Sequence, residues 1–225
     1  MKVTNTKLIR WAGLSAVIAG IIFTAIQPTH PSINTSAFII ITSLKTSISI
    51  FGLLGITGLY ARQVEETGWK GLAGYLLLTI YYAVQMCISF IEPTVLPLLT
   101  TTAPTFVESM LQLSSGTGVP MNLGSLTNVY SLASILYVLG SLLFGIAMFR
   151  ARILPREAAA LFAVSGPLAG TMFTLLPYQL VQLTSIPIGF AMVWLGYAIF
   201  SERRGKPSES LLDQRIVSQE PSKVA

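Results

Sequence analysis

Charged residues are scarce in this chain: only 10% of its 225 residues are Asp, Glu, Lys or Arg, while 52% are hydrophobic. A soluble globular domain carries about 25% charged residues, so the composition indicates a membrane protein. The net charge of +5 does not indicate a nucleic-acid partner, because all but one of the 14 Lys and Arg lie in the N-terminal segment, two short loops and the C-terminal segment. That distribution is a topology signal, so we expect a lipid bilayer and no nucleic acid among the partners.

Residues for metal binding and redox chemistry are also scarce. The single cysteine, Cys87, excludes a disulfide within the chain, and the single histidine, His30, excludes a site that needs two histidine ligands. No Asp lies in an apolar segment, and the sequence contains no GxSxG or HExxH motif. We therefore expect no metal, no cofactor and no catalytic residue, and a lipid-modifying membrane enzyme is the least favoured of three functional classes.

Long apolar runs dominate what is present. Six of them approach the roughly 20 residues that a helix needs to cross about 30 Å of hydrocarbon. They lie near residues 8–27, 37–61, 70–92, 128–149, 157–176 and 180–200. The first is treated as a span rather than a cleaved signal peptide, because the run is long and no small-x-small site ends it. The sequence predicts an all-α polytopic membrane protein, a bundle of six transmembrane helices within residues 1–204, followed by a flexible tail, 205–225.

Lys and Arg flank alternate connections between these segments. They precede the first segment, fill or border 62–70 and 150–156, and follow the sixth segment, whereas 28–36 and 93–127 contain none. By the positive-inside rule, both termini are cytoplasmic and 93–127 is an outer loop. The expected location is a plasma membrane, with a bacterial cytoplasmic membrane as the first choice.

The outer loop 93–127 is the longest connection. Thr105 and Glu108 within it fit a capping box, and Phe106 and Met110 are spaced as on one side of a helix. The pattern predicts a short helix near 105–113 on the outer membrane surface. Such a helix could cover a site as a lid, but ordinary loop packing is the commoner explanation.

Lys45 is the one basic residue in the middle of an apolar segment, where a charge is costly. Its side chain leans toward the outer side and could reach the interface by snorkelling. It could instead pair with Glu92, the one acid close to a helix interior. The second and third helices form a hairpin, and at the helical rise these two residues differ in depth by about 8 Å, much of which an outward-leaning lysine closes. The pair is the preferred interpretation.

Four of the predicted helices carry small or polar residues along one side, at intervals of three and four positions. Tyr130, Ser134 and Ser141, for example, share the side that carries Tyr137. Polar side chains in lipid need internal partners, so these sides are expected to face the bundle interior. The candidate ligand-binding residues on them are Lys45, Tyr82, Gln85, Glu92, Tyr137 and Gln182.

The same sides also fit a purely structural role, because small and polar residues let helices approach closely and hydrogen-bond to each other. Ala12, Ala16 and Gly20 form such a row in the first segment, and Gly166 and Gly170 form a GxxxG pair in the fifth.

Three functions therefore remain open. The first is binding or transport of a small solute or lipid in an outward-facing polar cavity. The second is a non-catalytic structural or regulatory partner of another membrane protein, or a homo-oligomer, held by the small-residue rows. The membrane enzyme is third. A cavity that reaches the outer surface favours the first, and a buried Lys45–Glu92 contact without a cavity favours the second.

Overall fold

The computed structural model describes residues 5–115 and 119–201, and all regular secondary structure in these residues is helical. The helices are α1 (Asn5–Ile26), α2 (Ser36–Ala61), α3 (Val64–Thr94), α4 (Leu96–Leu99), α5 (Pro104–Ser115), α6 (Ser125–Ala151), α7 (Arg156–Leu175), α8 (Tyr178–Thr184) and α9 (Ile186–Ser201). The expected tail, 205–225, lies outside the described residues.

Five helical stretches are long and apolar enough to cross a membrane, which indicates an integral, multi-pass membrane protein. They are Lys7–Ile26, Ser36–Arg62, Val64–Thr94, Ser125–Ala151 and Leu180–Ser201. The segment expected to span at 157–176 is the 20-residue helix α7, which packs in the bundle but is not one of the five. The count of six spans therefore stays a prediction.

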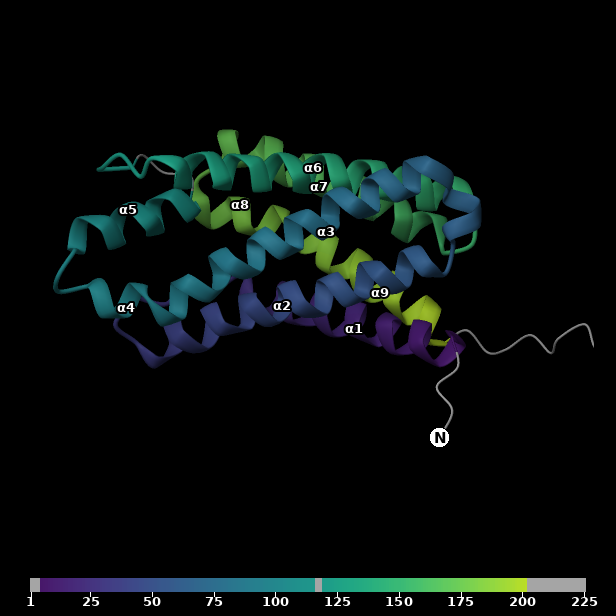
Figure 1. Cartoon of the computed structure of the whole chain (residues 1–225), viewed down its shortest axis with the longest axis horizontal. Helices are drawn as coiled ribbons and strands as arrows, with labels where there is room; N and C mark the ends of the chain where they lie inside the picture. Colours follow the sequence, from purple (N-terminus) through teal and green to yellow (C-terminus); the bar gives the residue numbers. More distant parts are fainter. Residues whose placement is uncertain (1–4, 116–118, 202–225) are drawn as a thin grey trace, which may run out of the picture.

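The six long helices form a closed ring. In ring order, α1 packs on α2, α2 on α3, α3 on α6, α6 on α7, α7 on α9, and α9 returns to α1. Figure 1 shows them running along the long axis, with α4 and α5 at one end and both described chain ends at the other. Arg10 Nε donates to the Phe200 carbonyl over 3.2 Å, which ties α1 to α9 at that second end. We call the two ends the α5 end and the terminal end.

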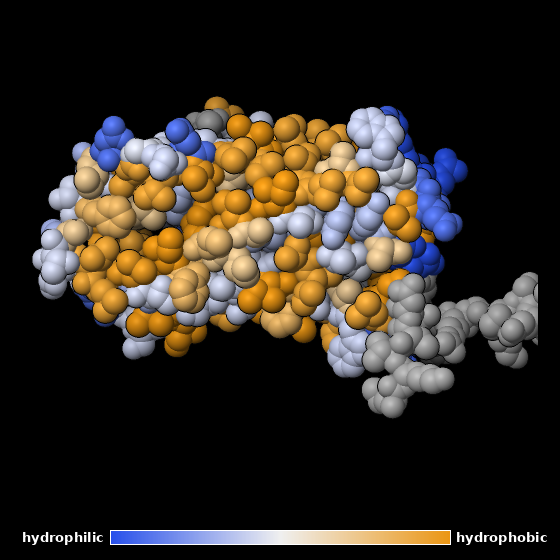
Figure 2. All heavy atoms as spheres, viewed as in Figure 1, coloured by the Kyte–Doolittle hydropathy of each residue, from blue (hydrophilic) through white to orange (hydrophobic). Residues whose placement is uncertain are grey.

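The lateral surface is apolar, as a lipid-facing surface should be. Figure 2 shows hydrophobic side chains over most of the long side, while strongly hydrophilic side chains gather at the two ends. Exposed Ile40, Leu54, Leu76, Ile135 and Trp194 are examples of this outer layer. The burial pattern thus agrees with a helical bundle whose lateral surface contacts lipid.

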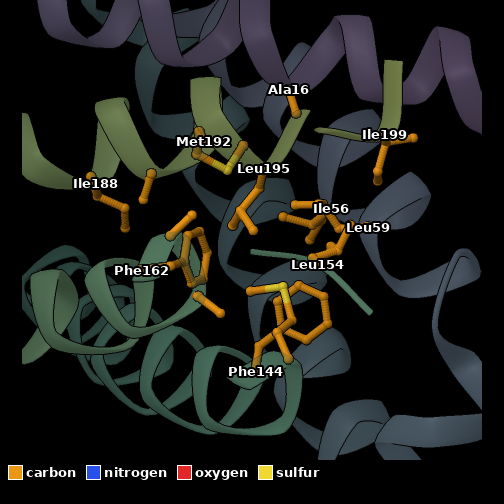
Figure 3. Close-up of a cluster of buried hydrophobic side chains, with 14 of the residues drawn as sticks. Ala16, Ile56, Leu59, Phe144, Leu154, Phe162, Ile188, Met192, Leu195 and Ile199 are labelled. Carbon is orange, nitrogen blue, oxygen red and sulfur yellow. The ribbon is translucent and has the colours of Figure 1, made fainter. Parts of the chain in front are cut away.

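The main buried cluster joins all six long helices (Figure 3). Phe144 of α6 and Phe162 of α7 meet edge to face at its centre, with ring centroids 6.2 Å apart. Ile56 of α2 and Leu195 of α9 complete the contact across the ring, and neither is accessible to solvent. Because lipid tails are as apolar as these side chains, tight packing rather than the hydrophobic effect holds such a cluster together.

Small residues set the distance between α1 and its two neighbours. A methyl group at Gly55 of α2 would lie 2.8 Å from the Cα of Ala16, and one at Gly20 of α1 would lie 2.5 Å from the Gly189 carbonyl of α9. Both approaches are closer than any real Cβ contact, so only glycine fits. The small-residue row expected on the first helix therefore packs within the chain, against α2 on one side and α9 on the other.

Two helices differ from the expected ones. α3 begins at Val64, six residues before 70, and its first turn is set apart by a kink at Gly68 (φ 56°, ψ −156°), a backbone conformation that favours glycine. The helix expected at 180–200 is divided at Ser185 into α8 and α9. Pro187 consequently lies in the first turn of α9, where its missing N–H is not needed.

Candidate functional site

The facing sides of α2 and α3 bring together the residues singled out by the sequence. Two contacts fix how these antiparallel helices meet. Toward the α5 end, Lys45 Nζ lies 2.7 Å from Glu92 Oε2. Toward the middle, the Tyr82 ring lies over Gly52, where a methyl group would be 2.5 Å from Tyr82 Cε1. The expected ion pair is therefore present, and the two polar sides face each other over about 10 Å of helix between these contacts.

The Lys45–Glu92 pair is asymmetric in its surroundings. The Lys45 side chain is 36% exposed, whereas the Glu92 side chain is 7% exposed. At 2.7 Å the contact is a short, charge-assisted hydrogen bond. It uses one of the three Nζ donors and one of the two carboxylate oxygens. Both charged groups therefore keep hydrogen-bonding capacity beyond their mutual contact.

Lys45 leaves α2 on the side opposite the lipid-facing residues of that helix. At 100° per residue, exposed Ile40, Ile50 and Leu54 lie together on one side of the helix, and Lys45 lies on the opposite side. Thr42 and Ser49, which neighbour Lys45 one turn away in each direction, are each 2% exposed. Lys45 thus pairs with Glu92 rather than snorkelling along the lipid face, and about a third of its side chain stays accessible.

α6 supplies a third polar group beside the pair. Tyr130 lies close enough to Glu92 for the two to interact electrostatically. The Tyr130 hydroxyl is buried and makes no hydrogen bond with any described residue. Thr46 Oγ1, next to Lys45 in sequence, is buried and unpartnered in the same way. A buried hydroxyl without a partner costs free energy, so a group that hydrogen-bonds to it would be stabilised there.

Gln85 lies on the same side of α3 as Glu92, about 10 Å further from the α5 end. Its Nε2 donates to Ser89 Oγ over 3.1 Å on the same helix, and Ser89 is fully buried. This bond holds the Gln85 amide along the helix rather than toward Lys45. Gln85 and Ser89 therefore extend the polar side of α3 from the ion pair away from the α5 end. They do not contact the ion pair.

Tyr82 and Tyr137 belong to an aromatic cluster. The Tyr81 ring joins them, with its centroid 5.2 Å from Tyr82 and 5.0 Å from Tyr137. On α3, Tyr82 is about 15 Å from Glu92 along the helix, so the cluster is separate from the ion pair. Sequence reasoning missed Tyr81, because it lies beside the polar side of α3 rather than on it.

Gln182 stands apart from the other candidates. It lies on the short helix α8, which packs on α7 and α9. Its Oε1 is buried and has no hydrogen-bond partner among residues 5–115 and 119–201. No hydrogen bond in those ranges links it to the ion pair or to the aromatic cluster. The structure thus groups Lys45 and Glu92 with Tyr130, a residue that shares a helix side with Tyr137 but was not among the candidates.

Chemically, the Lys45–Glu92 site offers one ammonium, one carboxylate and one phenol. These groups can hold charges and exchange hydrogen bonds with a bound molecule. The described part of the chain contains no group of three or more His, Cys, Asp or Glu placed to hold a metal ion. No protein-family model, curated protein or solved structure matches the chain.

Proposed function

We propose that this integral membrane protein binds or transports a small solute or a lipid at the Lys45–Glu92 site, through a polar cavity that opens on the outer side of the membrane. The observation that carries the proposal is the accessibility of Lys45 on the bundle-facing side of α2. A lysine kept only to hold two helices together would be expected to be enclosed with its partner, because water access weakens the pair.

The proposed topology has six spans, cytoplasmic termini and an outer α5 end. Arg10, Arg62, Lys70, Arg150 and Arg156 all lie in or beside the terminal end, and this clustering is what the positive-inside rule associates with the cytoplasmic side. The Lys45–Glu92 site lies toward the opposite end. A ligand would therefore reach it from outside, past α4 and α5.

The structural-partner alternative stays open, because the Lys45–Glu92 contact expected under it is present. It also relied on small-residue rows as docking surfaces, but these rows are already packed within the chain. Gly20 meets Gly189, as described above, and a methyl group at Gly170 of α7 would lie 2.8 Å from Val138 of α6. A partner protein would need a different surface.

A labelling experiment tests the cavity. The variant Lys45→Cys is made with Cys87→Ser, which removes the native thiol, and with Glu92→Gln, so that no buried charge is left unpaired. Position 45 is expected to react with a membrane-impermeant methanethiosulfonate reagent added to the outer side of sealed vesicles. Ile50→Cys, on the lipid side of the same helix, is the matched control and should not react. If position 45 is as unreactive as position 50, the proposed function is wrong.

A further inference from the structure

We propose that the ligand of the Lys45–Glu92 site is a zwitterion: a small molecule or lipid headgroup that carries an ammonium group and a carboxylate or phosphate close together. This inference rests on the function proposed above and specifies its ligand. It is drawn from the opposite charges of the pair, their unequal burial and the unpartnered Tyr130 hydroxyl.

The first step concerns net charge. Lys45 and Glu92 together are neutral, and they lie in a part of the chain surrounded by apolar helices. A ligand with a single charge would bring that charge into a poorly solvated site and would satisfy only one member of the pair. A zwitterion adds no net charge. Laid antiparallel to the pair, it places its anion against the ammonium and its cation against the carboxylate, so every charge faces an opposite one.

The second step concerns hydrogen-bonding capacity. Lys45 Nζ retains two donors for a carboxylate or phosphate oxygen, and Glu92 retains a carboxylate oxygen for an ammonium group. Tyr130 Oη can donate to the anion or accept from the cation, which would satisfy a buried hydroxyl that has no partner in the described residues. An apolar ligand would leave the Tyr130 hydroxyl without a partner and would use none of the remaining hydrogen-bonding capacity of Lys45 and Glu92.

The third step concerns unequal burial. Lys45 is the accessible member and Glu92 the enclosed one. The anion of the ligand would therefore meet the site first and nearer to solvent, and its ammonium group would go deeper, toward Glu92. A phosphoethanolamine headgroup and a free amino acid share this chemistry, so the experiment must separate a lipid from a soluble source.

Binding is measured by isothermal titration calorimetry on the full chain in maltoside micelles. The soluble zwitterions are glycerophosphoethanolamine and β-alanine, and the lipid zwitterion is dihexanoylphosphatidylethanolamine. Single-charge controls are ethanolamine, glycerophosphoglycerol and dihexanoylphosphatidylglycerol. At least one zwitterion is expected to bind about tenfold or more tightly than every single-charge probe, because each of those leaves one charge of the pair without a new partner. Binding of a soluble zwitterion identifies a solute, and binding of the short-chain lipid alone identifies a lipid headgroup.

Two variants locate the binding. The neutral variant Lys45→Met/Glu92→Gln should lose the zwitterion preference, whereas Lys45→Arg, which keeps the charge, should retain it. Unchanged binding by the neutral variant, equal binding of single-charge probes, or no binding of any zwitterion overturns the inference. These failures are distinct from a failure of the proposed function, because the labelling of position 45 is measured without any ligand.

Discussion

Replacing Lys45 by methionine removes the ammonium group, keeps much of the side-chain length and leaves the Glu92 carboxylate without its 2.7 Å partner. Breaking a fully buried ion pair costs about 3–5 kcal/mol, whereas an exposed pair contributes about 0–1 kcal/mol. The stranded carboxylate is only 7% exposed, so Lys45→Met should cost about 3 kcal/mol. In Glu92→Gln the stranded group is Lys45, which is 36% exposed, so that change should cost only about 1 kcal/mol.

The double variant Lys45→Met/Glu92→Gln strands no charge, so it should recover most of the stability that Lys45→Met loses. The assay is equilibrium unfolding in mild detergent, titrated with sodium dodecyl sulfate and followed by tryptophan fluorescence. Comparing both single variants with the double variant gives the interaction free energy of the pair. Two results would refute the reasoning: a cost for Glu92→Gln equal to that for Lys45→Met, or a double variant as unstable as Lys45→Met.

Three further predictions concern packing, lipid exposure and topology. Gly145→Ala should destabilise the bundle by about 1–3 kcal/mol, because its methyl group would lie 2.5 Å from the Ala163 Cα of α7. The control in the same unfolding titration is Ile146→Ala, a change on the lipid side of the same helix, and it should cost less. Cys87 is exposed on α3 within a candidate span, so in sealed vesicles it should react with a lipid-soluble maleimide and not with an impermeant thiosulfonate. With cytoplasmic termini, green fluorescent protein fused to the C-terminus should fluoresce in bacterial cells, and alkaline phosphatase fused there should be inactive; the reverse pattern would contradict the topology.

Much of the helical architecture could be predicted from sequence, because the apolar runs are long and local. The Lys45–Glu92 contact could be predicted as well, since both residues lie on one hairpin and the helical rise fixes their relative depth. The division of the last predicted span at Ser185 was harder to predict from the sequence. Proline interrupts helices, so Pro187 makes a break near it understandable, but only the packed structure shows that the break precedes the proline by two residues.

The burial of Gln63 could not be predicted from the sequence. It is fully buried, and neither its Oε1 nor its Nε2 has a hydrogen-bond partner among residues 5–115 and 119–201. A polar residue in the short connection between two spans is normally expected at the surface. Its burial depends on how the helices pack around that connection, next to which the first turn of α3 is kinked at Gly68. Contacts between helices that are distant in sequence, such as that of Tyr81 with Tyr137, could not be predicted either. They depend on the order of the helices around the bundle rather than on the spacing of residues along one helix.

The closure of the ring by α1 and α9 has a consequence for synthesis. Arg10 and Phe200, which meet at the terminal end, are 190 positions apart in the chain. At about 5–20 residues per second, a ribosome needs roughly 10–40 s to add that stretch. Throughout this interval, the side of α1 that carries Gly13 and Gly20 has only lipid or insertion machinery to cover it. A substitution at Gly189 or Gly196 of α9 would thus act after the other helices have been inserted, as a defect of final assembly, and it would leave the first helix open to degradation.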